Sequence, residues 1–97
     1  MQTVADLKRA IHSGVKLKLV NAMMSGAKEP HKYIGVVRTV TKVQTNGFYC
    51  ATDEQLAEGK KGSFCNMPKA TQFKGQEDGF TITDDCGMRS YQIVEAL

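Results

Sequence analysis

An Asn-Gly pair near the middle of the chain constrains the fold more than any other feature. Asn46-Gly47 separates two runs rich in Val, Thr and aromatic residues, within residues 33–51. Both residue types tolerate positive φ, as a type I′ turn requires, so this stretch is predicted to form a β-hairpin. The turn sets the register, which predicts one hairpin face with Thr45 opposite Phe48 and Val43 opposite Cys50, and a second face with Lys42, Gln44, Tyr49 and Ala51.

The N-terminal residues carry the signals of a short amphipathic helix. Thr3 and Asp6 have the spacing of a capping box, in which each side chain accepts a hydrogen bond from the other residue's amide. The apolar residues that follow recur at helical spacing and make one stripe: Val4, Leu7, Ala10 and Ile11. Gly14 suits the left-handed position that ends a helix. We therefore expect a helix over about residues 3–13, with its apolar stripe packed on the sheet.

The other strands are predicted from alternation and from turn residues. Residues 15–19 alternate between apolar side chains facing inward and two lysines, Lys16 and Lys18, facing water. Residues 21–32 contain Gly, Pro and polar residues and are expected to form a long loop. A polar tract with one helical turn follows the hairpin, and later strands are expected near residues 63–67, 72–74, 80–83 and 88–95.

These elements predict one domain over residues 1–97, of mainly β (α+β) class. One N-terminal helix and about six short antiparallel strands describe a small SH3-like β-barrel or curved sheet capped by the helix. An OB-like barrel is the alternative, because a similar set of strands with a long early loop can be wound that way. No apolar run approaches the ~20 residues that span a bilayer, and no signal peptide is recognisable. We therefore expect a cytoplasmic protein with no membrane partner.

No group of residues has the spacing of a catalytic, metal or cofactor site. The three cysteines, Cys50, Cys65 and Cys86, lack the spacing of zinc ligands and are expected to be buried thiols. The two histidines, His12 and His31, are expected to be exposed, one on a polar helix face and one in a loop. The glycine patterns of phosphate-binding loops are also missing from the sequence. We therefore expect a protein that is not an enzyme and that uses no metal and no cofactor.

Charge is unevenly distributed along the chain, although the net charge is only +3. Residues 1–49 contain eight cations and two carboxylates, net +6, whereas residues 50–97 contain five cations and eight carboxylates, net −3. Such asymmetry is typical of a basic face that meets an acidic partner. The predicted partner-binding residues come from the first strand, the loop after it and the hairpin: Lys16, Lys18, Met23, Met24, Lys28, Lys32, Arg38 and Lys42. The polar tract at residues 53–62 is the alternative contact surface.

Several segments of the chain resemble a known group of proteins. They are T-V-A-D-L-K-R-A-I near the N-terminus, R-T-V-T-K-V-Q-T-N-G-F in the hairpin, and M-P-K-A-T-Q-F followed by D-G-F-T-I. Together they resemble short uncharacterised proteins encoded in bacteriophage and prophage genomes, although that group has more tryptophan in the third segment than this Trp-free chain. The resemblance implies a phage-encoded, non-enzymatic inhibitor of the anti-CRISPR kind. Such a protein would act by protein–protein binding and surface occlusion of a host defence protein or ribonucleoprotein complex.

Two other functions are compatible with the sequence. A small β-barrel that binds nucleic acid in phage regulation or replication would use a basic groove with aromatic side chains on which bases stack. A protein that sequesters a small nucleotide signal would need a deep polar pocket. An edge strand near residues 72–74 also offers pairing between two copies of the chain, so a homodimer is a further expected form.

Overall fold

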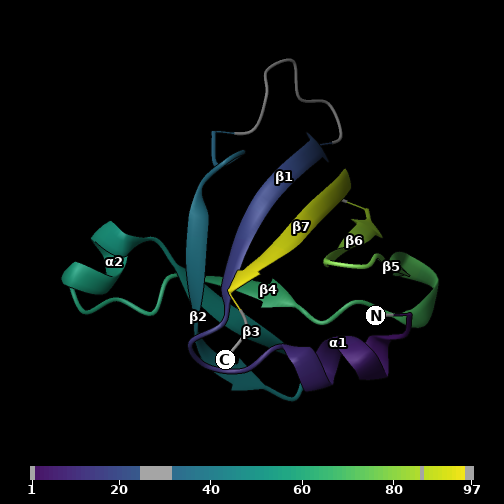
Figure 1. Ribbon diagram of the computed structural model, residues 1–97, viewed down its shortest axis with the longest axis horizontal. Helices are drawn as coiled ribbons and strands as arrows, with labels where there is room; N and C mark the ends of the chain where they lie inside the picture. The colour runs from purple at the N-terminus through teal and green to yellow at the C-terminus, as the bar shows by residue number, and fades with distance from the viewer. Residues whose placement is uncertain (1, 25–31, 86, 96–97) are drawn as a thin grey trace.

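The computed structural model describes residues 2–24, 32–85 and 87–95, which form one antiparallel sheet with short helices beside it (Figure 1). The helical elements are α1 Val4–Ala10, α2 Asp53–Ala57 and the 3-10 turn η1 Ala70–Gln72. In chain order the strands are β1 Lys16–Met24, β2 Val37–Gln44, β3 Gly47–Ala51, β4 Ser63–Asn66, β5 Phe73–Gly75, β6 Gly79–Asp84 and β7 Gly87–Glu95. Their order across the sheet is β4-β3-β2-β1-β7-β6-β5. Within these residues, no helix is long and apolar enough to cross a membrane.

The mainly β class is confirmed, but the described residues form an open sheet rather than a closed barrel. Two features oppose closure between the edge strands. β4 is followed closely by Pro68, which has no amide hydrogen to donate, and β5 has only three residues. Of the two predicted forms, a barrel or a curved sheet, the described residues form the sheet; it has seven strands, one more than expected, and an SH3-like relationship stays a prediction.

The open sheet curls around one shared core. Cys65 on β4 and Tyr91 on β7 are separated by three strands in the sheet order, yet both line one pocket and belong to one core cluster. Leu7 and Ile11 of α1 join the same cluster, and Figure 1 shows α1 lying across the lower end of the sheet. The predicted packing of the helix stripe on the sheet is thus confirmed. Strands from both halves of the sheet therefore contribute side chains to the same core on its inner face.

The helix forms as predicted but is shorter. Both halves of the capping box are present, because the Thr3 hydroxyl accepts from the Asp6 amide at 3.2 Å and the Asp6 carboxylate accepts from the Thr3 amide at 3.0 Å. The helix ends where Ile11 becomes extended. Gly14 does have a positive φ, of 97°, but it lies in the next turn, where its amide donates to the Val40 carbonyl at 2.8 Å.

The first strand extends further than predicted. The three inward side chains of residues 15–19 are at most 2% exposed, as the alternation predicted. Residues 21–24, predicted as loop, continue the strand because residues 87–90 of β7 pair with them. Lys16 and Lys18 are half-buried rather than fully in water, since β1 lies in the middle of the sheet between β2 and β7.

The central hairpin forms, but its predicted register is wrong. Gln44 pairs with Gly47, so the two-residue loop is residues 45–46, and no residue of this turn has a positive φ. Val43 therefore lies opposite Phe48. The turn is not of type I′, which needs positive φ at both central positions.

A bulge further along the hairpin also changes which side chains of β2 and β3 share a face of the sheet. The pairing of β2 with β3 shifts between Val40 and Lys42, so that two residues of β2 oppose one of β3. Val43 is 41% exposed, whereas Cys50, predicted to share its face, is buried, and so is Ala51, which was predicted to lie on the other face.

Close packing of two strands explains why residue 47, which was predicted to be a turn residue, is a glycine. A Cβ atom on Gly47 would lie 2.3 Å from the Cys65 carbonyl oxygen and 2.5 Å from the ring of Phe64. Gly47 is therefore needed where β3 approaches β4, and the lack of a side chain matters more than freedom of φ.

The later elements follow the prediction closely. The expected helical turn is α2, which begins with a second capping box between Thr52 and Gln55. The strands expected near residues 63–67, 80–83 and 88–95 are β4, β6 and β7. The edge strand expected near residues 72–74 is β5, which ends the sheet.

We predict that Gly47→Ala lowers the free energy of unfolding by roughly 3 kcal/mol, because the new methyl group meets backbone that cannot move without separating β3 from β4. Gly59→Ala is the matched control, since Gly59 has a φ of 75° but open space around its Cβ position. The control should lose only about 1 kcal/mol, from backbone strain alone. Urea denaturation of both variants measures the difference. Equal losses would show that close packing is not the reason for Gly47.

Candidate functional site: a groove and an arginine pocket that meet at Tyr33

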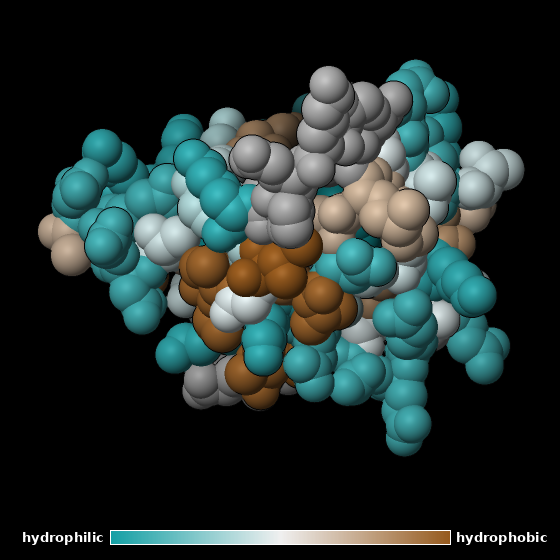
Figure 2. Space-filling view, turned by 90° about the horizontal axis from the view of Figure 1, so that it is seen from above, coloured by the Kyte–Doolittle hydropathy of each residue, from teal (hydrophilic) through white to brown (hydrophobic). Residues whose placement is uncertain are grey.

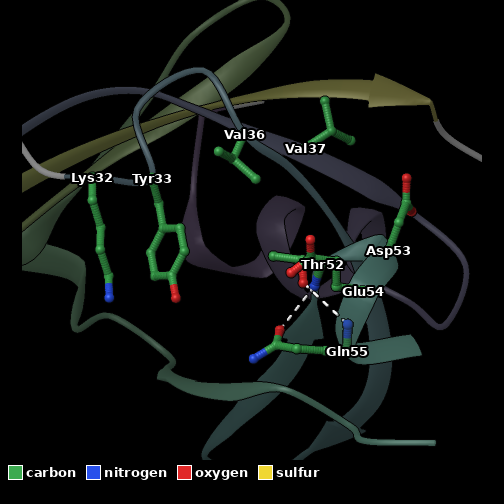
Figure 3. Close-up of a pocket in the computed structure, with 8 residues that line it drawn as sticks. All are labelled: Lys32, Tyr33, Val36, Val37, Thr52, Asp53, Glu54 and Gln55. Carbon is green, nitrogen blue, oxygen red and sulfur yellow. Dashed lines mark hydrogen bonds between the residues drawn. The ribbon is translucent and has the colours of Figure 1, made fainter. Parts of the chain in front are cut away.

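The largest cavity of the described residues is a groove between the start of β2 and α2, with a volume of about 610 Å³ (Figure 3). We call it the α2 groove; its lining residues are Lys32, Tyr33, Val36, Val37, Thr52, Asp53, Glu54 and Gln55. Its volume lies within the range of roughly 300–1,000 Å³ that is usual for ligand sites. Figure 3 shows the side chains of Lys32 and Tyr33 extending in the same direction on one side, with α2 on the other.

The α2 groove exists because β3 does not extend along the first two residues of β2. Ala51, the last residue of β3, lies opposite Thr39, so Val37 and Arg38 pair with β1 only. Next to them the chain turns away into α2, which Figure 1 shows projecting from the side of the sheet. The capping box holds this turn: the Thr52 amide donates to the Gln55 side-chain oxygen at 2.9 Å.

The two sides of the α2 groove carry opposite charges. Asp53 and Glu54 are exposed on the first turn of α2, while Lys32 is exposed on the other side. The Lys32 ammonium lies 5.1 Å from the centroid of the Tyr33 ring. The Arg38 guanidinium lies 5.4 Å from the same centroid, so that two cations contact one aromatic ring.

Tyr33 also lines a second, smaller cavity on the inner face of the curled sheet. This cavity, here called the arginine pocket, has a volume of about 180 Å³ and is lined by Leu19, Tyr33, Arg38, Ser63, Phe64, Cys65, Arg89 and Tyr91. It brings together residues of β1, β2, β4 and β7. The pocket is a consequence of the curl, because β4 and β7 are not neighbours in the sheet.

Arg38 is the most unusual residue of the arginine pocket. Its side chain points to the inner face, since it pairs with the buried Leu17, and it is only 8% exposed. Among the carboxylates that the structure describes, none forms an ion pair with Arg38. Burial of an uncompensated guanidinium is costly, so a buried arginine of this kind indicates a site for a negative group.

Cys65, which lines the arginine pocket together with Arg38, belongs to a pair of buried thiols. The sulfur atoms of Cys50 and Cys65 lie 4.0 Å apart, and both residues are buried and free of disulfides. The hydrogen bond from Cys50, together with the charges of Arg38 and Arg89 and the hydroxyl of Tyr91, lowers the pKa of Cys65 to about 6. That same hydrogen bond and burial raise the pKa of Cys50. The charge of Arg38 favours the ionised form of both thiols, and the two shifts together make Cys65 the thiol that ionises first.

The register of β3 and β4 disfavours a disulfide between these two cysteines. Cys50 lies opposite Ser63 and Cys65 lies opposite Phe48, so the two cysteines are diagonal neighbours. Diagonal positions in an antiparallel pair have Cα atoms roughly 7–8 Å apart, beyond the usual span of a disulfide. Buried thiols were expected, and this is confirmed for both; Cys86 lies outside the described residues.

The predicted partner-binding residues do not form one surface. Lys32 lines the α2 groove and Arg38 lies behind it, whereas Lys16 and Lys18 lie on the outer face of β1. Lys42 is also on the outer face, opposite Tyr49. Met23 lies at the C-terminal end of β1 and is 63% exposed. The side chain of Met24 and all of Lys28 lie outside the described residues. The sequence thus named two residues that line the two cavities, and the other described residues that it named line neither.

Sequence reasoning missed most of the arginine pocket. Arg89 appears in the sequence as one isolated charge in a strand, and nothing in its neighbours distinguishes it from a solvent-facing residue. Its contact with Cys65 and Tyr91 depends on the curl. Within the described residues, no group of three or more His, Cys, Asp or Glu side chains has the arrangement of a metal site.

No family model matches this chain, and no curated protein and no solved structure is detectably similar to it. Its function is therefore argued from the groove, the pocket and the surfaces around them.

We predict that Cys65 makes stability depend on pH. A thiol whose pKa is lowered on folding stabilises the folded state above its ordinary pKa, and this contribution is lost as the pH falls from about 9 to about 6. Cys50 has the opposite shift, so its ionisation opposes folding only at higher pH. Urea denaturation across this range should show that the free energy of unfolding of the wild type decreases as the pH is lowered. In Cys65→Ser the free energy of unfolding should depend less on pH. Identical profiles would mean that Cys65 is not ionised in the folded protein.

Proposed function

We propose that this protein is a non-enzymatic binding protein that inhibits a larger complex by occluding its surface, with the α2 groove as its main contact. The observation that supports this most directly is the position of Lys32 opposite α2. The sequence predicted the loop ending at Lys32 and the polar tract at residues 53–62 as alternative contact surfaces, and the fold unites parts of both in one groove. A phage origin, a host cytoplasmic location and a bacterial defence complex as target are part of the proposal and rest on the sequence resemblance.

The chemistry of the α2 groove suits a protein partner. Tyrosine is enriched among the residues that contribute most to binding in protein interfaces, and Tyr33 is held in place by two cations. Opposite charges at Lys32 and Glu54 would fix the orientation of a partner more than they would add affinity.

Exposed apolar side chains extend the surface next to the α2 groove. Val20 is 44%, Ile34 38% and Val37 37% exposed, and the Gly35 amide donates to the Leu19 carbonyl, which brings the turn of Ile34 against β1. Figure 2 shows hydrophobic side chains gathered in the middle of the face seen from above, with hydrophilic side chains on both sides. An apolar centre with a polar rim is the usual anatomy of a protein interface.

The test is a tagged pull-down from host cells that carry their defence systems, with nuclease treatment of a parallel sample. We predict recovery of one stoichiometric protein complex that survives the nuclease. The double variant Lys32→Glu/Glu54→Lys reverses both charges of the α2 groove at exposed positions and should reduce recovery at least tenfold. Lys74→Glu, at an equally exposed lysine on β5, is the control and should bind like the wild type. Full recovery by the double variant would exclude the α2 groove as the contact.

Nucleic-acid binding is the second candidate function, and a cluster of two aromatic rings and a lysine favours it, in which Phe64 also lines the arginine pocket. Tyr49 and Phe64 pack edge to face with centroids 5.0 Å apart, and the Lys61 ammonium lies 4.6 Å from the Tyr49 centroid. Lys42 pairs with Tyr49 across the hairpin. Aromatic side chains flanked by lysines are the usual platform for single-stranded nucleic acid.

We predict that, if this second function holds, the protein binds a single-stranded oligonucleotide with an affinity that falls steeply with added salt. Lys61→Gln combined with Tyr49→Leu keeps an apolar side chain in place and should weaken binding about tenfold, by loss of stacking and charge. Fluorescence anisotropy measures both effects, with Lys74→Gln as control. Undetectable or salt-insensitive binding would rule out this function.

A further inference from the structure

We propose that the arginine pocket is a binding site for one oxyanion group of the phosphate type, held between Arg38 and Arg89. The group is either free inorganic phosphate or the phosphate of a monoester whose organic part extends past Tyr33 into the α2 groove. This inference goes beyond the proposed protein contact, because the two arginines lie on the inner face of the sheet, and only the organic part of a monoester would share the α2 groove with a partner.

Two guanidinium groups with unused donors face this pocket. Arg38 is 8% exposed, lines the pocket and makes no ion pair or hydrogen bond with the residues that the structure describes. Arg89 donates from its Nη2 atom to the Asp84 carboxylate at 2.6 Å, but its buried Nε atom has no hydrogen-bond partner among the described residues. A guanidinium presents several donors in a fixed fork, which suits the oxygens of a phosphate group.

The size of the arginine pocket limits what enters it. Its volume of about 180 Å³ is smaller than the roughly 300 Å³ at the lower end of sites for whole small molecules. One tetrahedral group is therefore the expected occupant, rather than a nucleotide as a whole. Because Tyr33 lines both cavities, a monoester has room for its remaining atoms in the α2 groove, beside the tyrosine ring.

The thiol pair can offset the positive charge of the arginine pocket before an anion binds. Four groups from three strands face Cys65: Cys50 from β3, Arg38 from β2, and Arg89 and Tyr91 from β7. A negative charge on Cys65 would compensate Arg38 in the empty pocket, whereas Arg89 is already paired with Asp84. An incoming anion would be repelled by this charge, so binding should be coupled to uptake of one proton by Cys65.

The experiment is a calorimetric titration of the wild-type protein with inorganic phosphate, phosphoserine and adenosine 5′-monophosphate, at a pH near 7. We expect a dissociation constant of about 1 mM or tighter for at least one of them. At least tenfold tighter binding of a monoester would assign the α2 groove to its organic part, and equal binding would assign a site for the free anion. No binding of any probe at tens of millimolar would overturn the proposal.

Substitutions of single arginines distinguish anion binding in the arginine pocket from a general effect of positive charge on anion binding. Arg38→Gln removes the buried charge and should abolish binding, whereas Arg9→Gln, at an exposed arginine on α1, should leave it unchanged. If Arg38→Gln does not fold, Arg38→Lys keeps the charge without the fork and should weaken binding at least tenfold. Wild-type affinity in Arg38→Lys and Arg89→Lys would overturn the proposal.

A pH series with sulfate tests the role of Cys65, because sulfate itself does not titrate near neutral pH. Affinity should fall at least fivefold between a pH of about 6 and a pH of about 9 in the wild type. In Cys65→Ser, which cannot ionise, the affinity should not change with pH over this range. A merely structural role of Cys65 would leave the pH dependence of the variant like that of the wild type, and that result would overturn the coupling. The charge-reversal variant Lys32→Glu/Glu54→Lys should still bind sulfate, so failure of the protein contact and failure of this site are distinguishable.

Discussion

The pairing of β1 with β7 is the interaction on which the rest of this structure depends. The strand order consists of two meanders, β1 to β4 and β5 to β7, and the ladder between β1 and β7 is what joins them. It spans both strands for almost their whole length, with two irregularities that bend it. Without this ladder the two meanders would have no common inner face. The core and the arginine pocket would then lack one of their walls.

Electrostatics on the inner face follows from this arrangement. Arg38 comes from the first meander and Arg89 from the second, and the curl brings both beside Cys65. Burial makes charge costly, and the region of the chain that the structure describes offers no carboxylate to Arg38. The sulfur contact between Cys50 and Cys65 and the charges of both arginines lower the pKa of Cys65, so this thiol is the group on the inner face that can become negative beside Arg38.

Tyr33 connects the two cavities and therefore the two proposals. Its ring contacts both Lys32, which is exposed, and Arg38, which is buried. The α2 groove outside it has the size and mixed charge of a contact surface, whereas the arginine pocket inside has room for one small group. A ligand in the pocket would hold Arg38, and through it the Tyr33 ring, in one position. Such preorganisation would favour binding of a partner in the groove.

Local interactions were readable from the sequence alone. The capping boxes at Thr3 and Thr52, the alternation of residues 15–19 and the presence of a central hairpin depend on residues only a few positions apart. Tertiary structure decided the rest, because it depends on neighbours distant in sequence. The hairpin register follows from the approach of Gly47 to β4, and the length of β1 follows from pairing with β7. Lys32 and Arg38 were recognised as cations, but only the curl of the sheet placed one of them in a pocket with Arg89.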